Sequence, residues 1–206
     1  MERADFTVHI VDDEETIRKS LAFMLTMNDF SVRAHESASA FLKLAPQLKA
    51  AVLITDLRMP DMSGVQLIQQ LVDMKLKIPA IVMTGHGDVP MAVEAMKAGA
   101  LDFIEKPFED ALMMDAIHNA ASRLQPEQDG VDDVDSVRER LDGLSEREKQ
   151  VFSAVVAGLP NKSIAYDLDI SPRTVEVHRA NVMTKMKAKS LPQLVRMALA
   201  AGVDES

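Results

Sequence analysis

Hydrophobic and polar positions follow two repeating patterns over the first 124 residues. Short apolar runs rich in β-branched residues occur at 7–11, 31–34, 51–55, 80–84 and 101–105. The segments between these runs carry apolar residues at spacings of three or four, as amphipathic helices do. Strands that alternate with helical segments form βαβ units. The pattern predicts a doubly wound α/β fold with a five-stranded parallel sheet, in the strand order 2-1-3-4-5 common to such folds.

A polar segment interrupts this pattern at residues 125–142, QPEQDGVDDVDSVRERLD. Its acidic residues, its proline and its glycine are typical of a linker. Apolar residues recur at Val134, Val137 and Leu141, so we expect the linker to be partly helical.

The last 64 residues predict four short helices. Ser145 and Glu148 form a capping-box sequence at the start of the first helix. A second helix is expected at about 161–168, and Ser171 with Pro172 predicts the start of a third, which continues to about residue 186. Two helices joined by a short turn form a helix-turn-helix. We therefore predict three regions: an α/β domain at 1–124, an acidic linker at 125–142 and a small all-α domain at 143–206.

Polar side chains follow four of the five predicted strands. Asp12 and Asp13 follow the first strand, Asp56 ends the third, Thr84 ends the fourth and Lys106 follows the fifth. In a parallel sheet these positions share one edge, where ligands of such folds bind. Carboxylates crowded together stay ionised only beside cations, and a hard divalent ion such as Mg²⁺ suits them. We expect a phosphoryl-transfer site with Asp56 as the nucleophile; a plain cation or ion-pair site is the alternative.

The segments VDDEETIRKSL, LITDLRMPDMSG, MTGHGDV and DFIEKPF make residues 8–122 resemble the receiver domain of two-component response regulators. The resemblance implies phosphorylation of Asp56 by a sensor histidine kinase. It also implies that Mg²⁺, or Mn²⁺ in its place, is bound by Asp13, Asp56 and the backbone carbonyl of Arg58, with Asp12 acting through water. Pro60 and Gly64 fit the turn after Asp56 in a structural role.

The same resemblance implies a switch. Thr84 and Lys106 respond to the phosphoryl group, Phe103 occupies the position of a mobile aromatic residue, and the Lys106–Pro107 peptide bond is cis, which proline makes accessible. The sequence of residues 84–108 is similar to that of nitrogen-fixation regulators. This similarity implies that the phosphodonor is a haem-based, oxygen-sensing kinase of the FixL type and that genes are activated at low oxygen. The haem belongs to that kinase, since nothing in this chain indicates a haem site.

The predicted third helix of the C-terminal region has two distinct faces. Val175, Val182 and Met186 fall on one side, which we expect to pack on the core. Residues of the exposed side that could contact bases are Arg173, Glu176, Val177, Ala180 and Thr184. Residues that could contact phosphates are Thr174, Arg179, Asn181, Lys185, Lys187 and Lys189. A helical interaction domain with a basic surface is the alternative.

Residues 144–200 resemble the DNA-binding domain of the LuxR family. The resemblance implies binding to double-stranded promoter DNA, contact with RNA polymerase and activation through a homodimer that forms on phosphorylation. We expect the dimer face at Val89, Pro90 and Val93, on a helix that the switch remodels. The unphosphorylated receiver would then disfavour the DNA-competent dimer.

Composition narrows these possibilities. The 206 residues contain no cysteine, which excludes disulfides and cysteine-ligated zinc. His9, His35 and His118 form no cluster in the sequence, and no glycine-rich loop follows the first strand, so we expect neither a histidine metal site nor a nucleotide. The net charge is −9, yet residues 143–206 hold nine basic and seven acidic side chains, so a polyanion would meet only this part.

No apolar run is long enough to cross a membrane, and the first residues do not resemble an export signal, so we expect a cytoplasmic protein. We expect no enzymatic turnover. A phosphatase of the haloacid dehalogenase type would need a D-x-D pattern after the first strand, where this chain has Asp12, Asp13 and Glu14. An output domain that binds RNA or protein is the remaining alternative to DNA binding.

Overall fold

The computed structural model describes residues 6–85, 89–124 and 134–203. Contacts divide these residues into two compact units. Residues 6–85 and 98–124 form an α/β unit; residues 89–97 and 134–203 form a helical unit. Each unit is described here by itself.

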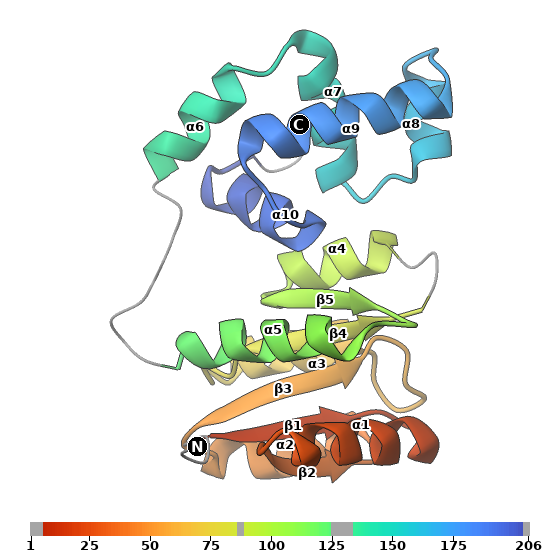
Figure 1. The fold of residues 1–206 in the computed structure, drawn as a ribbon. Coiled ribbons are helices and arrows are strands. Elements are labelled where there is room, and N and C mark those ends of the chain that lie inside the picture. Colours follow the sequence, from red (N-terminus) through yellow and green to blue (C-terminus); the bar gives the residue numbers. More distant parts are fainter. Residues whose placement is uncertain (1–5, 86–88, 125–133, 204–206) are drawn as a thin grey trace. The chain divides into compact units, whose positions relative to one another are not determined.

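The α/β unit is built on five parallel strands in the order β2-β1-β3-β4-β5 (Figure 1). The strands are β1 (Thr7–Val11), β2 (Ser31–His35), β3 (Ala51–Asp56), β4 (Ala80–Thr84) and β5 (Asp102–Glu105). This confirms the predicted fold class and strand order. The central strands β3 and β4 are apolar on both faces because both faces are covered, and residues 51–55 and 80–84 are all buried.

Helices α1 (Glu15–Met27), α2 (Ala38–Leu44), α3 (Gly64–Asp73) and α5 (Asp110–Ser122) connect or follow the strands, with a 3₁₀ turn at Ala45–Gln47. Leu21 and Leu25 of α1 pack in one core with Met113 and Ile117 of α5 and with alternate residues of the sheet. The intervening strand residues, such as Leu53 and Val82, are fully buried on the opposite face.

The helical unit contains α6 (Val134–Asp142), α7 (Glu146–Val156), α8 (Asn161–Asp167), α9 (Pro172–Met186) and α10 (Leu191–Ala200), and α4 (Val89–Lys97) is grouped with it. The four helices predicted after residue 143 are present. Ser145, Ser171 and Ser190 each accept a hydrogen bond from the third backbone amide that follows, as N-caps do. Helix α6 covers part of the predicted linker, and its Val137 is fully buried in the core of this unit. The domain boundaries predicted above stay a prediction.

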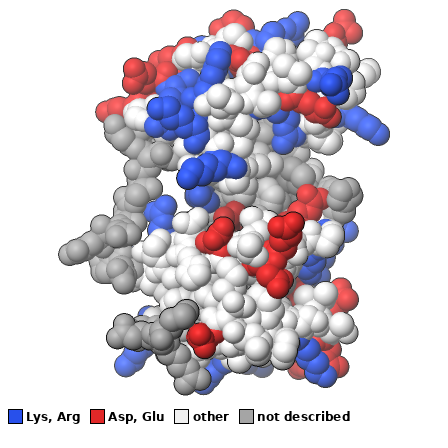
Figure 2. Space-filling view, viewed as in Figure 1, with Lys and Arg blue, Asp and Glu red and all other residues white. Residues whose placement is uncertain are grey.

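Charge of both signs is spread over the helical unit. In the view of Figure 2, blue Lys and Arg side chains and red Asp and Glu side chains are mixed over this unit rather than gathered into a uniform basic face. The numbers of basic and acidic residues in the sequence therefore do not locate a polyanion-binding surface on this unit.

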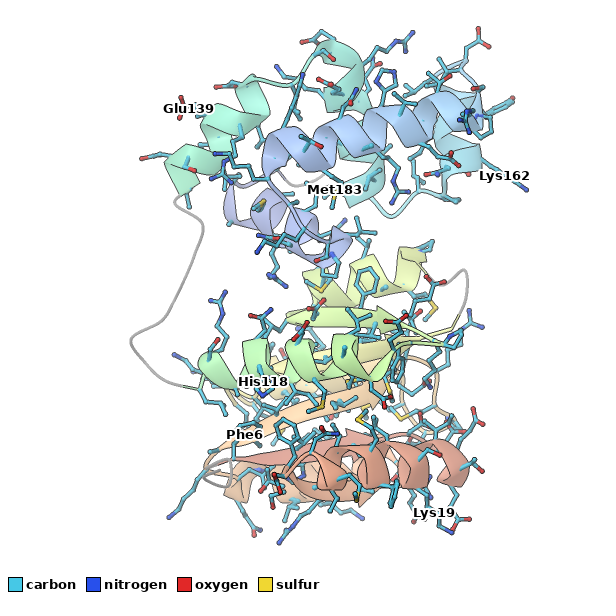
Figure 3. All side chains as sticks on the ribbon, viewed as in Figure 1. Phe6, Lys19, His118, Glu139, Lys162 and Met183 are labelled. Atoms are coloured by element: carbon cyan, nitrogen blue, oxygen red, sulfur yellow. The ribbon has the colours of Figure 1, made fainter. Side chains whose placement is uncertain are left out.

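The fold brings together two histidines that are far apart in the sequence. His9 Nδ1 and His35 Nε2 lie 2.9 Å apart with stacked rings, and Phe41 meets both rings edge-on. Burial lowers the pKa of His9 to about 4, and burial also lowers the pKa of His35. His118 instead lies near Phe30, which also contacts Phe6; Figure 3 labels His118 and Phe6 in the α/β unit.

Candidate functional site

One edge of the sheet collects the polar residues that end the strands. Asp12 follows β1, Asp56 ends β3, Thr84 ends β4 and Lys106 follows β5. Lys106 Nζ donates to Asp56 Oδ1, and to Asp12 Oδ2 at 3.1 Å. The expectation that topology would bring these three residues together is therefore met by the geometry.

The two carboxylates and the ammonium group depend on each other because they are removed from water. Asp12 is 1% exposed, and its burial raises its pKa even though the Glu14 amide and Lys106 stabilise the carboxylate. Burial alone would lower the pKa of Lys106, but hydrogen bonding and charge from Asp56 raise it. Lys106 is therefore a fully protonated cation between two acids at neutral pH.

The loops beside these residues carry the other predicted groups. Asp13 and Arg58 are exposed, and the Arg58 amide donates to Asp56 Oδ2 at 2.7 Å. Asp61 in the same loop accepts hydrogen bonds from the Ser39 amide at 3.0 Å and from the Ser39 hydroxyl at 2.9 Å, which anchors the loop to the start of α2.

Oxygen donors of this kind suit Mg²⁺, and a surplus of carboxylates over the single lysine favours a divalent cation. In the described part of the chain, however, no three acidic or histidine side chains are gathered closely enough to enclose a metal ion. The donor chemistry of these side chains nevertheless fits the ion.

The predicted switch residues Thr84 and Phe103 lie on β4 and β5, and Lys106 and Pro107 follow β5. Thr84 is 2% exposed, and its hydroxyl donates to the Gly85 carbonyl at 3.1 Å. Phe103 is half-buried. The Lys106–Pro107 peptide bond is cis, as the family resemblance implies. His86 lies outside the described residues.

Removing the ammonium group is expected to destabilise the α/β unit most strongly at neutral pH. In Lys106→Met, the buried Asp12 carboxylate would keep a like charge nearby and lose its cation, at a cost of about 1–2 kcal/mol given partial exposure of the site. Protonation of Asp12 would relieve this cost, so the loss at pH 7 should exceed the loss at pH 5. Urea unfolding at both pH values measures the difference, with the exposed Lys77→Met as control. An equal loss at both pH values would contradict the assignment.

Helix α9 has the two faces that the sequence predicts. Val175, Val182 and Met186 are buried, whereas Val177 is 55% exposed. Arg173, Glu176, Ala180, Asn181 and Thr184 are also exposed. The division of the helix into a core side and a free side is confirmed, and contact of the free side with DNA stays a prediction.

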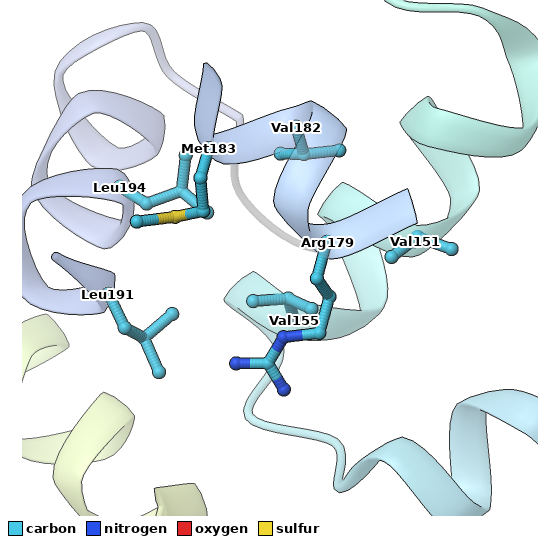
Figure 4. Close-up of a pocket in the computed structure, with 7 residues that line it drawn as sticks. All are labelled: Val151, Val155, Arg179, Val182, Met183, Leu191 and Leu194. Carbon is cyan, nitrogen blue, oxygen red and sulfur yellow. The ribbon is translucent and has the colours of Figure 1, made fainter. Parts of the chain in front are cut away.

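Three of the residues predicted to contact phosphates have hydrogen-bond partners on other residues of the chain, although the Lys185 side chain stays 45% exposed. Arg179 is half-buried among apolar side chains of α7, α9 and α10, which line a small cavity with it (Figure 4), and it donates to Asn161 Oδ1 at 2.6 Å. Burial lowers its pKa. Lys185 Nζ donates to Glu148 Oε2 at 2.6 Å, and Thr174 is bonded to Ser171. Lys187 and Lys189 are exposed. Arg179 is therefore only partly exposed, and contact of these residues with phosphates stays a prediction.

Glu148 is the acidic centre of this small network. Lys185 and the Ser145 amide both donate to its Oε2, and Lys185 above all lowers the pKa of Glu148 to about 2. A carboxyl group whose pKa is depressed in the folded state stabilises the protein above its ordinary pKa near 4.5, and this stabilisation is lost as the pH falls toward 2.

We expect Glu148→Gln to weaken the helical unit at neutral pH and to remove this pH dependence, because glutamine can keep the capping bond but not the charge. Circular dichroism during denaturant unfolding, repeated between pH 6 and about pH 2.5, would show it. A variant whose stability still declines as steeply as that of the unchanged protein would contradict this role.

The residues of the expected dimer face differ in exposure, and the face stays a prediction. Val93 is 1% exposed and belongs to the packed side of α4, where Ala92, Ala95 and Met96 are also buried. Pro90 is exposed, and the side chain of Val89 lies outside the described residues. Val93 is therefore unavailable to a second copy in this conformation.

Sequence reasoning missed Arg18, which donates from Nη1 to the backbone carbonyls of Asp12 and Asp13. Its sequence position four residues after Glu14 gives no signal of this contact. Among the described helices, none is long and apolar enough to cross a membrane.

Comparison with known proteins matches both parts of the chain to described families. Residues 8–118 match the response regulator receiver domain, and residues 142–198 match the luxR family of bacterial regulatory proteins. The transcriptional regulatory protein FixJ of Rhizobium meliloti is 71% identical over 202 residues, which cover 98% of this chain and 99% of that protein. FixJ of Azorhizobium caulinodans is 54% identical, covering 95% of this chain and 93% of that protein.

Solved structures agree with these matches. The crystal structure of full-length FixJ from B. japonicum shares 44% identity, covers 98% of this chain and all of that chain, and superposes with a TM-score of 0.59. The structure titled FixJ-N shares 69% identity over 57% of this chain and 94% of that one, with a TM-score of 0.56.

Proposed function

Since this chain belongs to the response regulators that join a receiver domain to a luxR-family domain, we propose that phosphorylation of Asp56 controls how tightly α9 binds promoter DNA. The observation that carries the proposal is the Lys106 ammonium group, which reaches both Asp56 and Asp12 at the sheet edge. Lysine at this place would neutralise one oxygen of an incoming phosphoryl group. The chain is a transcriptional regulator, as its FixJ relatives are named.

In the proposed reaction, an Asp56 carboxylate oxygen attacks phosphorus while the bond between phosphorus and the donor breaks, which yields an acyl phosphate. The side chain of Asp56 is 15% exposed, so part of the carboxyl group faces solvent, from which a donor would approach. We propose a sensor histidine kinase as the donor. Asp13, Asp56 and the Arg58 carbonyl would hold Mg²⁺ or Mn²⁺, with Asp12 acting through water, and the ion would neutralise the charge of the phosphoryl oxygens.

The acyl phosphate would then be sensed by Thr84. Its hydroxyl would exchange the Gly85 carbonyl for a phosphoryl oxygen, and the neighbouring Phe103 side chain would change position with it. This change would remodel α4 into a dimer face around Val89, Pro90 and Val93, which requires Val93 to leave its buried position. A dimer would place two copies of α9 one helical turn apart on DNA.

The FixJ relatives suggest the biological setting. We propose that the partners are an oxygen-sensing kinase of the FixL type, RNA polymerase and promoters of nitrogen-fixation genes, and that the protein works in the cytoplasm. Exposed Val177 and Ala180 could meet thymine methyl groups, and exposed Glu176 could accept a hydrogen bond from cytosine.

Incubation of the full chain with a small-molecule phosphodonor and Mg²⁺ tests the proposal. We expect the intact mass to rise by one phosphoryl group and the sizing profile to shift toward a dimer. Asp56→Asn, which keeps the shape of the side chain, should show neither change. A mass gain that persists in Asp56→Asn would refute the assignment of this residue, and phosphorylation without a change in size would refute activation by dimerisation.

A further inference from the structure

We propose that Arg18 is a positioning residue that sets the direction of the Asp12 and Asp13 carboxylates toward the divalent cation. This assignment rests on the proposed function, because it concerns the same site. Arg18 Nη1 donates to the Asp12 carbonyl oxygen at 2.7 Å and to the Asp13 carbonyl oxygen at 2.8 Å. One guanidinium nitrogen thus holds two consecutive peptide groups of the loop between β1 and α1.

The contact acts on the backbone, and through it on the acidic side chains. When two successive carbonyls converge on one donor, the peptide planes on both sides of Asp13 are fixed, and the direction of its Cα–Cβ bond is fixed with them. Two further hydrogen bonds hold Asp12. Its Oδ1 accepts a hydrogen bond from the Glu14 backbone amide at 2.8 Å, and its own backbone amide donates to the His35 carbonyl oxygen. The direction of the exposed Asp13 side chain therefore depends more on Arg18 than the direction of the Asp12 side chain does.

Electrostatics alone does not account for a positive charge at this place. Arg18 is the fourth residue of α1, where the helix dipole favours acidic rather than basic side chains. Its charge also lies beside carboxylates that are expected to bind a cation, and would repel that cation. The Arg18 Nη1 atom carries two protons and can donate to both carbonyl oxygens at once, which explains why a basic residue is tolerated here.

These two effects predict opposite results when the charge is removed. If Arg18 acts only through its charge, Arg18→Met should bind a divalent cation more tightly than the unchanged protein. If Arg18 positions the loop, the same variant should bind the cation more weakly. Supporting groups around metal ligands typically change metal affinity by about 10- to 100-fold when removed, so we expect a loss of about 10-fold.

Lys19 provides a matched control on the same helix. It is one residue further along, its side chain is 75% exposed and its ammonium group pairs with Glu15 at 2.7 Å. Figure 3 labels Lys19 on α1, projecting away from the sheet. Lys19→Met therefore removes the same charge from the same helix without touching the loop carbonyls.

The experiment titrates the full chain with Mn²⁺ and measures the free ion by electron paramagnetic resonance in the unchanged protein, Arg18→Met, Arg18→Lys and Lys19→Met. Thermal unfolding checks that each variant is folded. We expect about 10-fold weaker binding in Arg18→Met, a smaller loss in Arg18→Lys, and binding within about twofold of the unchanged protein in Lys19→Met. The rate of acyl-phosphate formation at limiting metal should fall in the same order, and saturating metal should largely restore it.

Equal or tighter Mn²⁺ binding by Arg18→Met would overturn the positioning role while leaving the proposed function intact. If Arg18→Met does not fold, Arg18→Lys decides, because it keeps the charge while its nitrogen lies one bond closer to the backbone than Nη1 and no longer reaches both carbonyl oxygens. Unchanged affinity in that variant would also overturn the role. Absence of Mn²⁺ binding by the unchanged protein would instead contradict the proposed function itself, together with this inference.

Discussion

Gly64→Ala is expected to prevent efficient phosphorylation of Asp56, although the substituted residue is eight positions away. A Cβ atom at position 64 would lie 2.5 Å from the Asp56 carbonyl oxygen and 3.2 Å from the Leu57 Cα. Both neighbours are backbone atoms, so no side-chain rotation relieves the contact. The loop from Asp56 to Gly64 must move, and its closing bond from the Gly64 amide to the Leu57 carbonyl, now 3.0 Å long, must stretch with it.

The sign of the change in stability distinguishes this steric explanation from the general effect of replacing glycine with alanine in a helix. Alanine favours helices over glycine by about 1 kcal/mol, so a residue at the start of α3 with no steric conflict would be stabilised by the substitution. We expect instead a loss of about 2 kcal/mol in the free energy of unfolding, and acyl-phosphate formation at least about 10-fold slower as the acceptor is displaced.

Intact-mass kinetics with a small-molecule donor and denaturant unfolding measure the two effects. Gly143→Ala is a matched control, since its Cβ would meet only the Arg140 and Glu139 carbonyl oxygens, at 3.4 and 3.7 Å. It should change neither quantity by much. A Gly64→Ala protein that is more stable and is phosphorylated at the normal rate would show that the turn is not constrained as described.

Val177→Asp is expected to have the largest effect on DNA binding. Val177 is 55% exposed on the free face of α9, where the proposal places base edges and phosphates. Aspartate at this position would remove an apolar contact with the bases and place a negative charge beside the negatively charged phosphates. We therefore expect affinity for the target duplex to fall about 100-fold. The fold should be unaffected, because the side chain already faces water.

Val72→Asp offers the same chemical change at a similar exposure, 51%, on α3 of the α/β unit. Fluorescence anisotropy with a labelled promoter duplex at constant salt compares the two variants, since salt alone changes such affinities strongly. Affinity in Val72→Asp should match that of the unchanged protein. If both variants lose affinity equally, or neither does, the free face of α9 is not the DNA-binding surface.

The sequence predicted the fold well because its elements carry strong local patterns. Residues 51–54 and 80–83 are continuously apolar, which suits a sheet covered on both faces, and the strand order follows from common α/β topology. The same topology was sufficient to bring Asp12, Asp56 and Lys106 to one edge. The strand-to-strand register brings His9 and His35 together, since His35 is paired with Val11 and lies diagonal to His9.

Contacts made by the ends of long side chains could not be predicted from the sequence patterns. The Arg18 bonds to two carbonyls and the pairing of Lys185 with Glu148 each need three-dimensional positions that spacing does not supply. The burial of two residues could have been predicted from helical spacing, however. Arg179 is four residues after Val175 and three before Val182, so helical spacing places it toward the core, and Val93 shares its face with Met96 for the same reason.

The central claim is that a phosphoryl group on Asp56 of the α/β unit changes the affinity of the helical unit for DNA. Its most direct test is the affinity of the full chain for a promoter duplex before and after phosphorylation, at one salt concentration, with Asp56→Asn treated identically. The account predicts at least about 10-fold tighter binding by the phosphorylated chain and no change in Asp56→Asn. Equal affinity of the phosphorylated and unphosphorylated chains would contradict it.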